Sequence, residues 1–341
     1  MRLSIPGVRV VAVETCDFGL MPRYDTAALL RLACPERAAR VLESPVSRRM
    51  LTELGVEYRH MTQVPGQQSE PARLTALDLA RSALERLRAR RPGVLDQLDA
   101  FIFVSTSNPN PSNCQAALLA ERLGFTTSCS DMKAGCSSGV LALAQGALLI
   151  GAGCERVLVV MAENLSQLTP AEDLRALLTV GDGAACVLLE KATGPGFLSV
   201  LHNTAPEFAS AFVLRTPFPP ARPDARYVYE FSDTQVVPEF VHRRWRELVH
   251  ESCAASGTTV SGLSQCFLHQ THVAQIESLV RDTGLAPASV PLVVQDHGNM
   301  GSPTFAVAMA RTFASLVPGQ RYLMAAVGGG VSSCAIVAEH A

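Results

Sequence analysis

The chain has 341 residues, of which 48% are hydrophobic and 18% are charged, and its mean hydropathy is +0.19. This composition excludes a disordered chain and is sufficient for a large core, which a chain of this length can divide between two fused units. The formal net charge of −2 indicates neither a nucleic-acid-binding surface nor attraction to an acidic membrane. The ten cysteines are scattered without the spacing of zinc ligands, which predicts reduced thiols in a cytoplasmic protein with no metal site.

The N-terminal residues lead into an apolar run at 8–13, which predicts a strand rather than a secretory signal. Residues 134–154 carry no charge and are long enough to raise the alternative of a transmembrane helix. Ser137, Ser138, Gln145 and several glycines in this stretch instead favour a helix that packs closely inside the protein. We therefore expect a buried central helix and no membrane span.

Helices and strands are expected to alternate, in the same order twice. In the first part, the patterns predict helices at 75–90, 111–123 and from Cys136 onward, and strands at 100–104, 156–161 and 184–189. In the second part, they predict helices at 237–255, 272–283 and from about Ser302, and strands at 265–268, 322–327 and 331–337. This repeated order suggests a duplication into halves 1–195 and 196–341, each an α/β unit with a parallel-rich, helix-covered sheet.

The segment 203–235 departs from this order. Five prolines interrupt any periodicity there, and six aromatic residues lie among them. A connection of this length without secondary structure of its own is usually functional or disordered. We expect it to act as a lid rather than as a plain linker.

Cys136 stands at the start of the charge-free helix, within Gly135-Cys136-Ser137-Ser138-Gly139. The thiolate is the reactive form of cysteine, and the N–H groups of a helix N-terminus are expected to lower its pKa and to lie close to an oxyanion. Cys136 is therefore a candidate nucleophile. The alternative is a structural role, because an unpaired cysteine commonly acts as a small buried hydrophobe.

Motifs elsewhere in the chain favour the catalytic role. They are Phe-Leu-His-Gln-Thr-His at 267–272, His-Gly-Asn-Met-Gly-Ser-Pro at 297–303, Val-Gly-Gly-Gly at 327–330, Gly-Val-Glu-Tyr-Arg-His at 55–60, Pro-Ser-Asn-Cys-Gln at 111–115 and Val-Gly-Asp-Gly-Ala at 180–184. In this order and approximate spacing, they resemble motifs of the thiolase superfamily, most closely of β-ketoacyl-acyl-carrier-protein synthase III (KAS III). The resemblance implies an acyltransferase with a five-layered α-β-α-β-α fold built from two duplicated halves. It also implies a homodimer and an active site between the halves.

The same resemblance implies a division of roles. Family members transfer an acyl group from a thioester to the cysteine, and a carbanion made by decarboxylation of a malonyl thioester then attacks it. Cys136, His269 and Asn299 match the three catalytic positions, and the backbone N–H groups of Cys136 and Gly329 match the oxyanion hole. His269 Nε2 and Asn299 Nδ2 can stabilise the enolate that decarboxylation leaves.

Three neighbouring residues are candidates for supporting roles around this site, namely Gln270, His272 and His297. Asp182, between two glycines, is interpreted as a turn residue because Asp favours local hydrogen bonds to backbone N–H groups. We expect Cys136 and Asn299 to occupy corresponding positions in the two halves. Each should lie just before a helix that follows a strand.

Departures from the family pattern bear on the substrate. Arg49 and Glu53 occupy positions where members that bind coenzyme A carry an aromatic and a basic residue. This favours an acyl-carrier-protein thioester over a coenzyme A thioester, and no tightly bound cofactor is expected. Lys133 near the nucleophile and the sequence Gly-Asn-Met-Gly-Ser at 298–302 favour a specialised pathway, such as polyketide or other secondary metabolism.

Three alternative functions remain open at this stage. The first is acyl transfer to an alcohol or amine without decarboxylation, against which the presence of Asn299 argues. The second is a serine hydrolase that uses Ser137 in a Gly-x-Ser-x-Gly elbow, although the preceding residues 126–131 are polar where such an elbow follows an apolar strand. The third is an inactive scaffold subunit, against which the intact Cys136, His269 and Asn299 argue.

Overall fold

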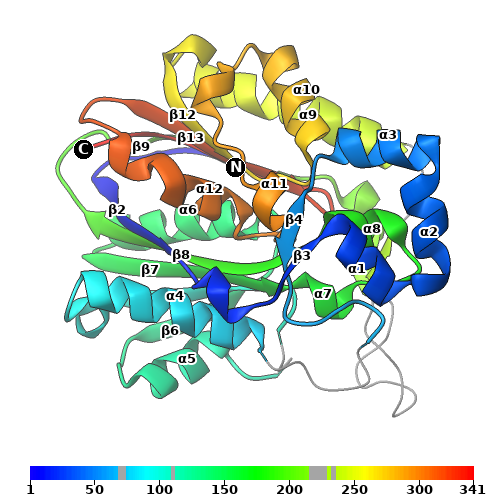
Figure 1. The fold of residues 1–341 in the computed structure, drawn as a ribbon. Coiled ribbons are helices and arrows are strands. Elements are labelled where there is room, and N and C mark those ends of the chain that lie inside the picture. Colours follow the sequence, from blue (N-terminus) through cyan, green and yellow to red (C-terminus); the bar gives the residue numbers. More distant parts are fainter. Residues whose placement is uncertain (68–73, 109–111, 215–228, 232–235) are drawn as a thin grey trace.

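Two five-stranded sheets form the centre of the molecule (Figure 1). The computed structural model describes residues 1–67, 74–108, 112–214, 229–231 and 236–341. The first sheet contains, in spatial order, β2 (Val8–Thr15), β8 (Asp182–Lys191), β7 (Arg156–Asn164), β5 (Ala100–Val104) and β6 (Ser128–Met132). The second contains β1 (Arg2–Ile5), β9 (Phe197–Thr204), β14 (Ser332–Glu339), β13 (Arg321–Gly328) and β12 (Leu263–Leu268).

The two sheets share a common plan, as expected for a fold of two duplicated halves. In β2-β8-β7-β5, the first two pairings are antiparallel and the third is parallel. The series β9-β14-β13-β12 repeats these directions. The fifth strands differ: β6 joins β5 in parallel, whereas β1 comes from the start of the chain and pairs antiparallel with β9.

The prediction of parallel-rich sheets is wrong, because antiparallel pairs are as frequent as parallel ones in the first sheet and more frequent in the second. The connection between β13 and β14 shows the reason. Only residues 329–331 separate these strands. A link this short can form a hairpin but not the crossover that a parallel pair requires.

Helices complete a five-layered α-β-α-β-α arrangement, as expected from the family resemblance (Figure 1). Between the sheets, α6 (Ser138–Gly151) and α12 (Thr304–Thr312) contact strands of both. The outer face of the first sheet is covered by α4 (Ala76–Arg90) and α5 (Gln115–Leu123). The outer face of the second is covered by α9 (Val236–Ala255) and α10 (Val273–Thr283).

The charge-free helix α6 is a core element, as predicted. Its glycines allow close packing, since a Cβ at Gly139 would lie 2.6 Å from the sulfur of Met161 on β7 and 2.8 Å from the ring of Phe305 on α12. Within the described residues, no helix is long and apolar enough to cross a membrane.

A group of short elements lies at one end of the sheets and was not predicted (Figure 1). It comprises β3 (Arg23–Asp25), α1 (Thr26–Ala33), α2 (Pro35–Glu43), α3 (Pro45–Leu54), β4 (Tyr58–His60), α7 (Leu165–Leu168) and α8 (Leu174–Thr179). The helices share a small hydrophobic core of their own. None exceeds ten residues, so periodicity was a weak signal, but Pro35 and Pro45 at first helical positions marked the starts of α2 and α3.

Two other segments differ from prediction. The helix expected from Pro111 begins at Gln115, because the Asp131 carboxylate accepts hydrogen bonds from the N–H groups of Gln115 (2.7 Å) and Ala116 (3.0 Å) and so fixes the first turn. In the segment expected to be a lid, β10 (Phe212–Leu214) pairs antiparallel with β11 (Tyr229–Phe231). Residues 215–228 and 232–235 of that segment lie outside the described part of the chain.

Candidate active site

Cys136 lies in the turn between β6 and α6, directly against the end of β13. A Cβ at Gly135, where φ is +60°, would lie 2.6 Å from the carbonyl oxygen of Gly329, and one at Gly328 would lie 2.5 Å from the Cβ of Cys136. Only glycine permits both approaches. The glycines predicted to complete the oxyanion hole therefore pack against the candidate nucleophile.

Cys136 as a whole residue is partly exposed, but its thiol has an unfavourable setting for ionisation. Burial, followed by the negative charge of Glu163, raises the pKa of Cys136 to about 11, while hydrogen bonds from the backbone of Gly329 and of Cys136 itself act in the opposite direction. The expected net lowering of this pKa is wrong, in part because α6 begins only at Ser138. The two backbone groups predicted as oxyanion donors nevertheless lie at the sulfur.

His269 follows the carboxyl end of β12, where its N–H donates to the carbonyl oxygen of Ala325 on β13 at 2.9 Å. The residue is 1% exposed. Burial lowers the pKa of His269 to about 4, and a backbone hydrogen bond with Gly301 opposes this effect only in part. The imidazole is therefore neutral near pH 7 and can donate a hydrogen bond through one ring nitrogen.

Asn299 lies between α11 (Val294–His297) and α12, and its main chain is held by the segment before β8. Its N–H donates to Thr179 at 2.7 Å, and its carbonyl oxygen accepts from Gly181 at 3.0 Å. Its side-chain Oδ1 accepts from the N–H of Gly301 at 2.9 Å. This bond fixes the orientation of the amide, so that Nδ2 is available as a donor.

The expected correspondence between Cys136 and Asn299 holds only in part. Both precede a central helix, but the turn of Cys136 follows β6, whereas α11 precedes Asn299. The second sheet has no counterpart of β6 among its described strands.

Several contacts bring the three predicted residues together at one end of the sheets, beside the carboxyl ends of β12 and β13. Because β12 and β13 are parallel, His269 and Gly328 lie at the same end. Gly301 contacts both His269 and the side chain of Asn299. Within the described residues, no direct hydrogen bond joins the side chains of Cys136, His269 and Asn299 to one another, and their catalytic roles remain predictions.

The predicted supporting residues have distinct positions. Gln270 holds the segment that leads to α11, since its Nε2 donates to the Pro291 carbonyl at 2.7 Å and its Oε1 accepts from the N–H of Val293 at 2.9 Å. His272 caps α10, because its Nδ1 accepts from the N–H of Gln275 at 3.1 Å. Through these contacts, Gln270 and His272 support the local main-chain structure.

His297 belongs to an aromatic cluster with His60 and Phe18. Its Nδ1 lies 3.3 Å from Nδ1 of His60, and its ring centroid lies 4.1 Å from that of Phe18. Burial lowers the pKa of His297 to about 3 and also lowers that of His60. Both rings are therefore neutral near pH 7, and one can donate to the other.

Near the site, one buried carboxylate was misinterpreted from the sequence and another was missed. The turn interpretation of Asp182 is wrong: the residue begins β8, is fully buried, and accepts hydrogen bonds from the N–H groups of Thr62 (2.7 Å) and Ser166 (2.9 Å). Glu163 lies near the end of β7 and is 1% exposed. A carboxylate that directly follows an apolar run predicted as a strand was the sequence signal for Glu163.

The Ser137 alternative loses its support. A strand does precede the elbow-like sequence, because the polar residues 128–132 form the edge strand β6. Ser137, however, is 0% exposed. Its Oγ lies 3.0 Å from the carbonyl oxygen of Ala134 and 2.8 Å from Oγ of Ser332. A hydroxyl enclosed in this way cannot reach a substrate without rearrangement.

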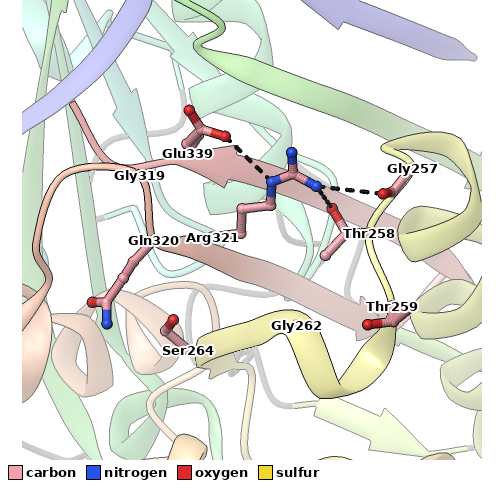
Figure 2. Close-up of a pocket in the computed structure, with 9 residues that line it drawn as sticks. All are labelled: Gly257, Thr258, Thr259, Gly262, Ser264, Gly319, Gln320, Arg321 and Glu339. Atoms are coloured by element: carbon pink, nitrogen blue, oxygen red, sulfur yellow. Dashed lines mark hydrogen bonds and ion pairs between the residues drawn. The ribbon is translucent and has the colours of Figure 1, made fainter.

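A surface hollow of about 510 Å³ lies elsewhere, at the amino-terminal ends of β12 and β13 (Figure 2). Arg321 crosses it and donates to Oε2 of Glu339 at 3.3 Å and to Oγ1 of Thr258 at 2.9 Å. The hollow contains none of the predicted catalytic residues. It is therefore separate from the candidate active site.

The five-layered arrangement is a thiolase-like fold. The sequence profile of 3-oxoacyl-[acyl-carrier-protein] synthase III matches residues 130–205, and that of its C-terminal part matches 253–340. A β-ketoacyl-[acyl-carrier-protein] synthase III from Neisseria meningitidis is 26% identical over 304 residues, which cover 84% of this chain and 88% of the relative. The chain is a KAS III-like condensing enzyme of the thiolase superfamily, and so an acyltransferase.

Solved structures agree in fold. A 3-oxoacyl-(acyl-carrier-protein) synthase from Burkholderia xenovorans has a TM-score of 0.85 at 20% identity, covering 100% of this chain and 96% of that one. A priming β-ketosynthase of a polyketide biosynthetic pathway has a TM-score of 0.83 at 19% identity, covering 99% and 97%.

Proposed function

We propose that the protein is a ketosynthase that transfers an acyl group from a thioester to Cys136 and condenses it with a malonyl-type thioester. The observation that carries this proposal is the packing of Gly328 and Gly329 on Cys136, at the sheet edge that also holds His269 and Asn299. Backbone N–H donors at the sulfur suit acyl transfer, and neutral side-chain donors beside them suit an enolate.

In the first half-reaction, Sγ of Cys136 attacks the thioester carbonyl. The oxyanion that forms accepts hydrogen bonds from the N–H groups of Cys136 and Gly329. Collapse of this intermediate releases the carrier thiol, which takes up the proton that Cys136 loses. Since the pKa of the resting Cys136 is about 11, this residue is a thiol near pH 7 before the substrate arrives.

In the second half-reaction, the malonyl thioester loses carbon dioxide and leaves an enolate. Nε2 of His269 and Nδ2 of Asn299 donate hydrogen bonds to the enolate oxygen. The neutral imidazole supplies its single N–H, which shifts from the backbone of Gly301 to the enolate, and Gly301 holds Oδ1 of Asn299 so that Nδ2 can donate. The carbanion then attacks the acyl carbonyl on Cys136. A β-ketoacyl thioester forms, and the Cys136 thiolate leaves and is protonated.

Release of carbon dioxide separates this function from simple acyl transfer. With an acyl thioester and a malonyl thioester labelled in its free carboxyl group, we expect labelled carbon dioxide and a β-ketoacyl product in equal amounts. Mass spectrometry and trapping of the label measure the two products. Transfer of the acyl group to an alcohol or amine, with no carbon dioxide from any malonyl donor, would establish the acyltransferase alternative instead. Failure to react with any thioester would support the scaffold alternative.

The acyl donor is proposed to be an acyl-carrier-protein thioester, with no tightly bound cofactor. Arg49 and Glu53 form an exposed ion pair along α3, with Nε of Arg49 2.9 Å from Oε1 of Glu53. The pair supplies neither a stacking aromatic ring nor an uncompensated positive charge for a nucleotide phosphate.

Carrier-protein thioesters should therefore acylate the enzyme with higher kcat/KM than coenzyme A thioesters of the same acyl group. Rapid-quench acylation assays measure this ratio. The double variant Arg49→Trp with Glu53→Arg restores an aromatic and a basic residue. It should therefore raise kcat/KM for coenzyme A thioesters alone and so lower the ratio of the two kcat/KM values. Equal or higher kcat/KM for coenzyme A in the wild type would contradict the assignment.

A homodimer and a specialised pathway complete the proposal. One of the two edge strands of the first sheet is β6, whose outward backbone groups can pair with another strand, and this supports dimerisation through that edge. Met300 and Gly301 beside Asn299 depart from the family motif, which supports a specialised condensation such as polyketide priming.

A further inference from the structure

Glu163 occupies a buried position between the two halves that no step of the proposed mechanism uses. Its carboxylate accepts hydrogen bonds from the N–H of Thr106 at 3.0 Å and from the N–H of Ser107 at 3.1 Å, both in the loop after β5. Across the interface between the halves, Oγ of Ser302 donates to its Oε1 at 3.1 Å. One side chain thus joins β7, this loop and the residues before α12.

We propose that Glu163 is a positioning residue: its carboxylate fixes the Gly301–Ser302 turn, and through it Asn299 and His269, relative to Cys136. This inference rests on the proposed function, because it assigns Asn299 and His269 to the enolate site. It adds a residue outside the three predicted catalytic positions.

The path from Glu163 to the two donors is short. A Cβ at Gly301 would lie 3.4 Å from Cγ of Glu163, so the turn packs on the stem of this side chain. The N–H of Gly301 holds Oδ1 of Asn299, and a backbone hydrogen bond of Gly301 reaches the ring of His269. A displacement of Gly301 would therefore move both enolate donors together.

The hydrogen-bond donors around Glu163 favour its ionised form. Two backbone N–H groups point at the carboxylate and cannot accept a proton from it, and hydroxyls of Thr106 (3.0 Å) and Ser107 (2.7 Å) add further donors. Burial raises the pKa of Glu163 above its usual value, and these hydrogen bonds offset that rise only in part. Such a set of donors is suited to a carboxylate, because the two backbone N–H groups can only donate and only the hydroxyls could accept from a carboxylic acid.

The negative charge of Glu163 also affects the pKa of Cys136. Among the described residues, the ionisable groups near the site include Glu163 on β7, Asp182 on β8, Cys136 before α6 and His269 after β12, together with exposed Lys133. Because His269 is neutral, Glu163 is the charged side chain in the described structure that shifts the pKa of Cys136, and it raises that pKa. Glu163 therefore favours the thiol form of Cys136 in the absence of substrate.

Glu163→Gln tests both consequences, because it keeps the size of the side chain and removes its charge. We expect the pH profile of Cys136 alkylation by iodoacetamide to move to lower pH, with about tenfold more thiolate at neutral pH for each unit by which the pKa falls. Peptide mass spectrometry separates Cys136 from the other nine cysteines. We also expect release of carbon dioxide from a malonyl thioester to fall at least tenfold.

Ser302→Ala is the matched control, because it removes the hydrogen bond from Ser302 to Glu163 and leaves the charge of Glu163 in place. It should slow decarboxylation and leave the alkylation profile in place. A Glu163→Gln protein with wild-type thermal stability, an unchanged profile and decarboxylation within twofold of wild type would overturn the inference. If Glu163→Gln does not fold, unchanged decarboxylation in Ser302→Ala overturns it. If the wild type decarboxylates no malonyl donor, the proposed function fails. The alkylation profiles of wild type and Glu163→Gln would still show whether the charge of Glu163 raises the pKa of Cys136.

Discussion

Replacing Cys136 by alanine should abolish acyl-enzyme formation. The variant keeps the backbone N–H groups of Cys136 and Gly329 but lacks the sulfur that attacks the thioester, and loss of an enzymic nucleophile costs on the order of 10⁶ in kcat. Incubation of the wild type with its acyl thioester should add the acyl mass to the peptide that contains Cys136. Intact-protein mass spectrometry of Cys136→Ala should show no adduct.

Two variants control for effects on folding and on neighbouring groups. Ser137→Ala alters the adjacent buried hydroxyl, and Cys154→Ala removes another partly exposed thiol just beyond the other end of α6. Both should still form the adduct. An adduct that persists in Cys136→Ala, or that maps only to another residue in the wild type, would refute Cys136 as the acyl carrier.

The fold could be predicted where strands and helices alternate with clear periodicity. The core strands β5, β7, β13 and β14 and the outer helix α4 are long apolar or amphipathic segments, and they were placed within a few residues. The edge strand β6 was missed because exposed Ser128 and Ser130 give it no apolar pattern. The pairing of β1 with β9 depends on residues about 195 positions apart, which no local pattern encodes.

The site could be predicted in its residues but not in its electrostatics. Motifs identify Cys136, His269 and Asn299, and the structure brings their segments to one edge. The pKa of Cys136 was predicted in the wrong direction, because burial and the charge of Glu163 exceed the effect of backbone donors. Glu163 is 27 residues from Cys136 and 139 from Ser302, so its role depends on tertiary contacts.

Asn299→Asp should separate the two half-reactions more sharply than any other single change at the site. The substitution keeps the oxygen that accepts from Gly301, but it replaces the donating Nδ2 by an oxygen that is negatively charged at neutral pH. Removal of one oxyanion donor commonly costs about 10²–10³ in rate, and an anion beside the developing enolate adds repulsion to that loss. Decarboxylation should therefore fall by about 10³ or more, while acylation changes far less, because Cys136 and Gly329 keep their backbone donors.

Acylation and decarboxylation of the same preparation provide the comparison. Acyl-enzyme formation is followed by mass spectrometry, and labelled carbon dioxide is collected from a malonyl thioester, for wild type, Asn299→Asp and Asn203→Asp. The last variant makes the same chemical change at an exposed residue near the end of β9 and should leave both rates unchanged. An equal loss of both half-reactions in Asn299→Asp would show that the residue supports the site as a whole. Retained decarboxylation would remove Asn299 from the enolate site and leave His269 as its side-chain donor.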